Sequence, residues 1–416
     1  RDLHSFPTRR SSDLMIHLLY LEANNQKHYC LIKSLSRLLR AQKGAGNKRY
    51  YCPRCLHGFT KESLLKNHED LCAGQSPQRV AMPKPDNNSL QFVDFHKQDR
   101  LKFVIYCDFE SLLVPLATCQ PPPNSSHSNR THLHVPCAFS YVVVSTFKEL
   151  SKPPVVYRGP DAVDRFLSLL LKEEDEILDI LYKYNPIIMT ESDWDDFLNA
   201  TNCHICGGPI GSEDLRVRDH MHIGLNSQGS NYRGLSHAMC NVKFKLSKRI
   251  PVVLHNLKNY DAHLIMEGIG KLGKDNIKCI PQNSERYILF SLGRHLTFID
   301  SFQFLSSSLA KLVDNLSKEG AEKFTLLERY LPSIPTELLI RKQVYPYKYM
   351  NSWDKFVETV LPPKDEFYSD ITGEHITDSD YEHAKTMWKV CKFKHLGDMC
   401  DFYVATDTLL LAQVME

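Results

Sequence analysis

Two sets of cysteine and histidine residues constrain the fold of this chain more than any other feature of its sequence. Each set begins with a Cys-x-x-Cys pair and ends with one histidine and one further cysteine, about one helical turn apart. Such spacing is typical of tetrahedral zinc sites, which take four thiolate or imidazole ligands. Two zinc-binding modules are therefore predicted, with ligands Cys52, Cys55, His68 and Cys72 in the first and Cys203, Cys206, His237 and Cys240 in the second.

The cysteine count agrees with metal ligation in a reducing compartment. The chain has 13 cysteines, an odd number that does not suit a disulfide framework. A nuclear or cytoplasmic location is therefore expected. No apolar run approaches the ~20 residues that a membrane span needs, so no membrane partner is expected.

Charge is segregated along the chain although the formal net charge is only +2. Ten Lys or Arg and one acid fall between Lys27 and Lys66, and seven Lys or Arg and one acid between Arg216 and Arg249. Asp161 to Asp196 instead holds eleven acids and three bases. Both basic zones overlap a predicted zinc module, which favours contact with a polyanion; solvated surface is the plainer interpretation.

A buried strand is predicted over Phe103–Cys107, followed by Asp108 and Glu110. Side chains alternate along a strand, so both carboxylates point to the same side. Like charges at the rim of a core are costly unless a cation lies between them, which favours divalent metal ions with oxygen ligands. The alternative is an ordinary strand end with solvated acids.

Two further carboxylates fall at ends of predicted elements. Asp261 follows a strand over Pro251–Leu254 at a strand-to-helix junction, where a simple first-turn acid that favours the helix dipole is the alternative. Asp407 lies on a helix predicted over Leu396–Met415, four residues after Tyr403 and on the same face. Helices are also predicted over Asp161–Tyr184 and Asp378–Cys391. A strand is predicted over Cys137–Ser145, and we expect it to pair with the carboxylate strand as a hairpin.

The predicted organisation alternates zinc modules with parts of one α/β domain. Residues 1–14 lack periodicity and are interpreted as foreign sequence. A hairpin and helix over 15–49, the first zinc module over 50–73 and a linker over 74–100 follow. The α/β domain comprises 101–201 and 248–416, with the second zinc module inserted over 202–247. Three histidines of the Pro-rich loop, His127, His132 and His134, are interpreted as polar filler rather than metal ligands.

Three short motifs carry a resemblance to a known family. DFE at Asp108–Glu110, HNLKNYDAHLI at His255–Ile265 and YVATD at Tyr403–Asp407 resemble the signature of the 3′→5′ exonuclease domain of family B DNA polymerases, in its DEDDy subclass. HNLKNYD together with Ser308-Leu309 is most similar to protein-primed polymerases. The first zinc module resembles a two-Cys, two-His finger with Cys72 as the last ligand. A finger in front and a zinc insert resemble the polymerases of Polinton (Maverick) elements, and the resemblance covers Met15–Glu416.

The resemblance implies an RNase H-like α/β (α+β) core that trims DNA from 3′ ends with two Mg²⁺ or Mn²⁺ ions. Asp108, Glu110 and Asp407 would hold one ion, and Asp108 and Asp261 the other, with Tyr403 orienting the water. The expected partners are single-stranded 3′ ends, primer-template DNA and a terminal protein primer. Because no polymerase palm follows Glu416, the sequence is expected to be an N-terminal polymerase fragment. The residues implied to contact the primer strand are Ser111, Asn256, Tyr260, Ser308 and Leu309.

The second zinc module separately resembles the endonuclease VII family of HNH-like nucleases. The positions that match its catalytic centre are Asp219, His220 and Asn241, which suit a general base and two oxygen ligands of one metal ion. Met221 stands where the family often has a second Asp, and His237 replaces a cysteine ligand. Two alternatives to the exonuclease therefore stay open: an HNH-type nuclease, and a non-catalytic zinc-finger DNA-binding relic of a transposable element.

Overall fold

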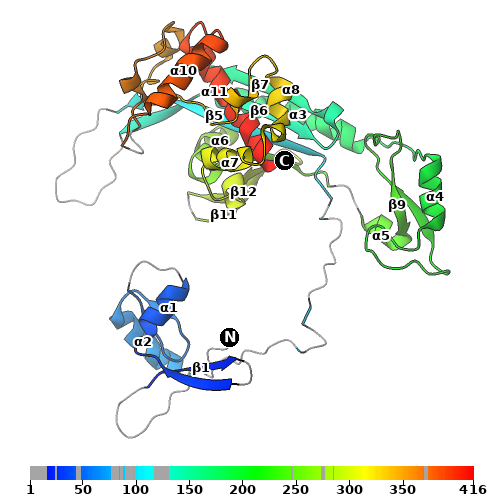
Figure 1. Cartoon of the computed structure of the whole chain (residues 1–416), viewed down its shortest axis with the longest axis vertical. Helices are drawn as coiled ribbons and strands as arrows, with labels where there is room; N and C mark the ends of the chain where they lie inside the picture. Colours follow the sequence, from blue (N-terminus) through cyan, green and yellow to red (C-terminus); the bar gives the residue numbers. More distant parts are fainter. Residues whose placement is uncertain are drawn as a thin grey trace. The chain divides into compact units, whose positions relative to one another are not determined.

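A computed structural model describes residues 16–23, 26–43, 48–75, 84, 88–89, 97, 99–116, 131–244, 247–272, 277–283, 285–369 and 373–416. The interpretation of residues 1–14 as foreign, and of His127 as filler, lies outside these residues. Contacts divide the chain into two units, residues 1–91 and 92–416, and each is described by itself (Figure 1).

The first unit holds a hairpin, a helix and a small zinc-finger-like motif. Strands β1 (Leu18–Ala23) and β2 (Gln26–Leu31) pair antiparallel, and α1 (Leu35–Lys43) follows. Two short paired strands, β3 (Tyr50–Tyr51) and β4 (Gly58–Phe59), then lead into α2 (Glu62–Ala73). The expected ββα arrangement around the first cysteine pair is confirmed.

The second unit is built on a seven-stranded mixed sheet in the order β11-β12-β13-β10-β5-β6-β7. The central strand β10 runs parallel to both β5 and β13, and the outer pairs are antiparallel. The predicted antiparallel pairing of the carboxylate strand with the next strand is confirmed. The strand bounds are β5 Phe103–Pro115, β6 His132–Ser145, β7 Lys152–Arg158, β10 Ile250–Leu254, β11 Lys278–Pro281, β12 Tyr287–Leu292 and β13 Leu296–Asp300.

Helices cover both faces of this sheet, so the fold is a mixed α/β arrangement (Figure 1). On one face, α3 (Ala162–Tyr182) and α6 (Asp261–Lys271) pack on Phe103, Ile105 and Cys107 of β5. On the other face, α7 (Leu309–Ser317), α8 (Thr325–Tyr330) and α11 (Leu396–Met415) pack on Tyr106 of the same strand. This alternation places the even-numbered residues of β5 toward α11.

The remaining elements frame these layers. Helix α4 (Glu191–Asn199) precedes the second zinc module, which contains β8 (Arg216–His220), β9 (Tyr232–His237) and α5 (Ala238–Lys243) and is inserted before β10. Helices α9 (Thr336–Leu339) and α10 (Asp378–Val390) precede α11. Short 3₁₀ turns cover Lys148–Leu150, Leu257–Asn259, Ser301–Gln303, Ala321–Lys323, Trp353–Val357 and Lys364–Phe367. None of the helices in the described ranges has the length and apolar character needed to cross a bilayer.

Candidate functional site: a carboxylate cluster and two zinc-type clusters

The carboxylates of Asp108 and Glu110 lie on the α11 side of β5, two residues apart as predicted. Glu110 is 5% exposed, whereas Asp108 is partly exposed. Burial, followed by the charge of Asp407, raises the pKa of Asp108 to about 7. Burial and then the charge of Asp108 raise the pKa of Glu110 well above its usual range. The two side chains therefore share one low-dielectric site.

Asp261 opens α6 directly after the turn that follows β10. Its side chain is buried, and its Oδ1 has no hydrogen-bond partner within the described chain. Its pKa is raised by burial first and by the charge of Asp108 second. Asp261 therefore lies close enough to Asp108 for their charges to interact, just beyond the end of β10, which runs parallel to β5.

Helix α11 delivers the third part of the site. Tyr403 and Asp407 are each 1% exposed, because α11 is covered by the sheet on one side and by the chain around residues 345–367 on the other. The Tyr403 hydroxyl lies 2.7 Å from the Tyr347 hydroxyl. Oδ1 of Asp407 has no hydrogen-bond partner in the described ranges. The helix thus buries a carboxylate that only a cation can satisfy.

Lys342 is the residue of this site that sequence reasoning missed. Its ammonium Nζ lies 2.9 Å from Oδ2 of Asp407 and 5.6 Å from the centre of the Tyr403 ring. Burial alone would lower the pKa of Lys342, but the charge of Asp407 outweighs it and raises the pKa well above its usual range. Lys342 is therefore a permanent positive charge among the acids.

Neighbouring residues fix the segment that carries Lys342. The Arg341 guanidinium pairs with Asp380 of α10. The Gln343 amide donates to the carbonyls of Leu338 and Arg341, at 3.0 and 3.1 Å. Its side-chain oxygen lies 2.9 Å from Nε2 of His383, also on α10. No periodic pattern marks this segment, so only the tertiary contacts place its lysine.

The four acids suit divalent metal ions by their donor type, and Asp261 and Asp407 have buried oxygens without a hydrogen-bond partner in the described ranges. They are not drawn tightly together: among the described residues, no three of these carboxylates have oxygens that all lie within 4.8 Å of one another. Lys342 supplies part of the positive charge that the cluster needs.

The residues expected to contact a DNA strand differ in their surroundings. Ser111 is 5% exposed on β5. Asn256 has a left-handed backbone with φ of 64°, and its Oδ1 accepts from Asn259. The Tyr260 hydroxyl lies 2.8 Å from Nδ1 of His134, so this histidine has a specific partner and is more than filler. The last two begin α7: the Ser308 hydroxyl caps the helix, and Leu309 is buried in the core.

Both predicted sets of zinc ligands come together. In each set, one atom from every residue lies within 4.8 Å of the others. In the first set, Nε2 of His68 lies 3.2 Å from Sγ of Cys55, and the sulfurs of Cys52 and Cys72 are 3.9 Å apart. Three sulfurs and one imidazole nitrogen at this separation match a tetrahedral zinc site.

The second set shows how the chain orients its histidine. Nε2 of His237 lies 3.1 Å from the Pro209 carbonyl, whereas Nδ1 lies 3.5 Å from Sγ of Cys206 and 3.7 Å from Sγ of Cys240. A donor bond from Nε2 leaves the Nδ1 lone pair for the metal. Burial raises the pKa of the Cys203 thiol, but backbone N–H groups outweigh burial and lower this pKa to about 6.

The HNH-like residues of this module have other partners. Oδ2 of Asp219 lies 2.8 Å from Nε2 of His204 and 3.3 Å from Nε of Arg233. Nε2 of His220 is buried without a hydrogen-bond partner in the described chain, and its ring lies 4.8 Å from that of His222. Asn241 lies on α5 and is partly exposed. The one carboxylate of this centre therefore already has two partners, the ring of His204 and the guanidinium of Arg233.

Comparison with known proteins adds no family assignment: no protein-family model, curated protein or solved structure matches this chain.

Proposed function

We propose that this chain carries a metal-dependent 3′→5′ exonuclease site for DNA, formed by Asp108, Glu110, Asp261 and Asp407 with Tyr403. The observation that carries the proposal is the convergence of acids from β5, α6 and α11 in one buried place, where their charges raise one another's pKa. A fold does not retain buried, mutually repelling carboxylates for stability, since such groups are costly without a cation.

The roles proposed for the carboxylates and for Tyr403 are those that the resemblance implies, and Lys342 adds a positive charge beside Asp407. Bound divalent ions would supply an activated water and stabilise the leaving 3′ oxygen. The carboxylates of Asp108, Glu110 and Asp407 would hold one ion, and those of Asp108 and Asp261 the other. Tyr403, held by Tyr347, would orient the water, and Lys342 would stabilise negative charge on the scissile phosphate. Ser111, Asn256, Tyr260, Ser308 and Leu309 would position the strand.

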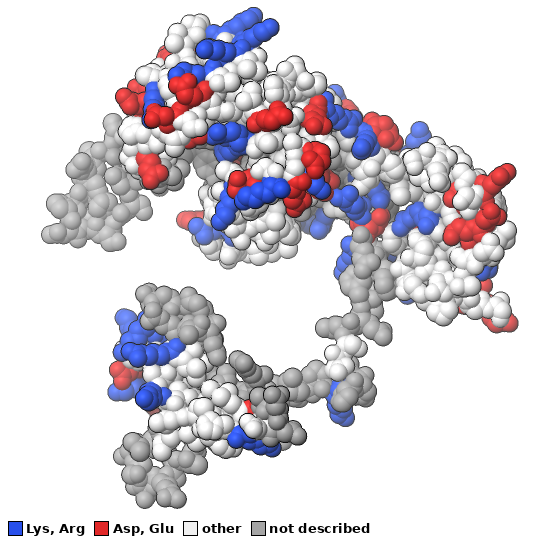
Figure 2. Space-filling model, in the orientation of Figure 1, with Lys and Arg blue, Asp and Glu red and all other residues white. Residues whose placement is uncertain are grey.

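The wider proposal is that the chain is part of a protein-primed family B DNA polymerase of the Polinton type, with an RNase H-like exonuclease core. Two zinc ions would hold the small modules, and these modules would bind DNA. The partners would be primer-template DNA and a terminal protein, in the nucleus or cytoplasm. The basic character of the first unit supports a DNA contact, since Lys and Arg outnumber acids on the face shown in Figure 2.

The test is cleavage of a 5′-labelled single-stranded oligonucleotide in Mg²⁺ by the full chain and by Asp108→Ala. A ladder that shortens from the 3′ end and falls at least 100-fold in rate with Asp108→Ala is expected. Asp164→Ala serves as the matched control, because Asp164 is an exposed acid on α3, on the opposite face of the sheet. Equal cleavage by the chain and Asp108→Ala would refute the assignment.

The alternative HNH-type nuclease has weaker support. Asp219 is paired with His204 and Arg233, which compete with a metal ion for its oxygen. Nicking of circular DNA that survives Asp108→Ala and is lost with His220→Ala would establish this alternative.

A further inference from the structure

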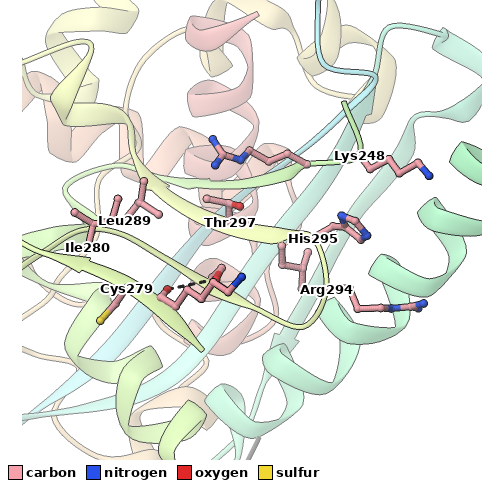
Figure 3. Close-up of a pocket in the computed structure, with 11 residues that line it drawn as sticks. Lys248, Cys279, Ile280, Leu289, Arg294, His295 and Thr297 are labelled. Carbon is pink, nitrogen blue, oxygen red and sulfur yellow. Dashed lines mark hydrogen bonds between the residues drawn. The ribbon is translucent and has the colours of Figure 1, made fainter. Parts of the chain in front are cut away.

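A cavity of about 440 Å³ lies at the end of the sheet opposite the carboxylates (Figure 3). Its lining comes from the segment before β10, from edge strand β11 and from the turn between β12 and β13. The carboxylates stand at the other ends of the parallel strands, since Asp261 follows β10. Five residues of strand separate the two ends by about 17 Å.

The side chains that line this cavity share one sign of charge. No acid is among the described residues that line it. Its floor is apolar, with Leu289 and Leu296, and Ser291 and Thr297 add hydroxyl groups. The basic side chains are Lys248, Arg249, Lys278, Arg294 and His295.

Two of these cations are already engaged toward α3, and Figure 3 shows both pointing away from Thr297. Arg294 lies 2.5 Å from Asp175, and Nζ of Lys248 lies 3.4 Å from the centre of the Tyr182 ring. Arg249 and Lys278 have no acidic partner within the described ranges, and both are exposed. Two unpaired cations at one concave site attract an anion, and low-dielectric walls strengthen that field.

The turn that carries Arg294 and His295 is held rigidly. Oε1 of buried Glu174 accepts hydrogen bonds from the backbone N–H groups of Arg294, His295 and Leu296. Gly293 has φ of 67°, and an added Cβ would lie 2.2 Å from the Glu174 carboxylate. This wall of the cavity is therefore preformed and does not need a ligand to order it.

We propose that this cavity binds the phosphate backbone of a nucleic-acid strand through Arg249 and Lys278. A backbone ligand fits best, because no Phe, Tyr or Trp is among the described lining residues and bases would find no ring to stack on. The site also continues a basic zone of the sequence, since Arg249 ends the stretch with seven Lys or Arg that begins at Arg216. The proposal requires a nucleic-acid partner but not the carboxylate chemistry.

The first experiment measures binding of a labelled single-stranded 20-mer by anisotropy, at several KCl concentrations and without Mg²⁺. Each phosphate contact contributes about 0.7 to the slope of log K against log salt for single strands. Arg249→Gln with Lys278→Gln is expected to reduce this slope by about 1.4. The control pair Lys389→Gln with Lys394→Gln changes two exposed lysines on or after α10 and leaves the slope unchanged. Equal slopes for the chain and the cavity variant would overturn the proposal.

The exposed thiol of Cys279 gives a local measurement inside the cavity. Alkylation of Cys279, followed by mass spectrometry, is expected to slow at least threefold with the oligonucleotide, and not in the Arg249→Gln/Lys278→Gln variant. If inorganic phosphate or a mononucleotide protects Cys279 from alkylation and the oligonucleotide does not, the cavity binds a small phosphate ligand rather than a strand, and the proposal is refuted. Neither readout uses cleavage, so failure here and failure of the exonuclease are distinguishable.

Discussion

At the scale of single residues, Asp108 links the electrostatics of the site to the stability of the chain. Its pKa is raised to about 7 by burial and by Asp407. The folded chain therefore binds this proton more tightly than the unfolded chain, in which the Asp108 carboxyl keeps its ordinary pKa of 3.8. Ionisation of buried Asp108 therefore lowers the free energy of unfolding. This loss of stability is absent below the unfolded pKa, grows as pH rises from about 4 to 7, and is fully present above 7.

Asp108→Asn is accordingly expected to stabilise the metal-free chain at pH 8 by roughly 1–2 kcal/mol, and much less at pH 5. Mn²⁺ should raise the melting temperature of the parent chain at pH 8 and have little effect on this variant. Denaturant unfolding at both pH values, with and without Mn²⁺, provides the measurement. A destabilised Asp108→Asn at pH 8 would show that Asp108 is an ordinary structural acid.

Lys342→Met has the opposite expected sign. It leaves buried Asp407 without its cation, and because the Lys342 side chain is 36% exposed, solvent screening reduces the expected loss of stability to roughly 1–3 kcal/mol. Lys342→Arg should recover most of that loss, because it retains the charge. The measurement is the free energy of unfolding of both variants without divalent metal ions. Equal stability of Lys342→Met and Lys342→Arg would show that the ion pair with Asp407 does not stabilise the chain.

At the scale of elements, α10 acts on the site through the segment it holds. Gln343 and His383 join this segment to α10. Burial lowers the pKa of His383. Protonation of this ring in acid therefore destabilises the folded chain. The stability that partly buried, neutral His383 contributes is therefore present above the usual pKa of about 6.5 and is lost as pH falls through the lowered value.

His383→Ala is expected to cost about 1 kcal/mol of stability at pH 8, less at pH 5, and to slow 3′-end cleavage without weakening DNA binding. The control is His375→Ala, which changes an exposed histidine in the neighbouring segment. The cleavage rate and the DNA affinity of both variants are measured on the same preparations. A lower rate with unchanged affinity would show that α10 positions Lys342, whereas a loss of both would indicate general destabilisation. An unchanged cleavage rate would show that α10 does not act on the site.

Comparison of the predicted with the observed bounds of helices and strands shows which features sequence periodicity predicts and which it does not. The helix predicted over Leu396–Met415 has the bounds that the structure shows, and the structure adds His395 as its N-cap. The carboxylate strand was predicted too short: β5 runs to Pro115, since β6 pairs with it along its whole length past Asp108 and Glu110. The position of Lys342 depends on hydrogen bonds to α10, far away in sequence, and no local pattern indicates it.

At the scale of the whole molecule, the two units are held by different forces. The second unit has three buried clusters around its sheet. In the first unit, α2 has no buried residue, and the described core contributes little beyond Leu39, Tyr51 and Cys52. So small a core rarely folds alone, and a structural metal supplies the missing free energy in modules of this size. We therefore expect that the first unit folds only when Cys52, Cys55, His68 and Cys72 bind zinc.

Removal of zinc by a chelator is therefore expected to abolish amide-exchange protection over residues 50–73 while leaving strand β5 protected. Cys52→Ser should show the same loss of amide-exchange protection even when zinc is present. Cys30→Ser, which changes a cysteine outside both clusters, should not. The contrast follows from the two folds: backbone bonds of β5 lie in a seven-stranded sheet under two layers of helices, and those of α2 are held mainly by two metal ligands. If the amides of α2 stay protected without zinc, side-chain packing alone stabilises this helix, and the four clustered residues are not needed as zinc ligands for the fold.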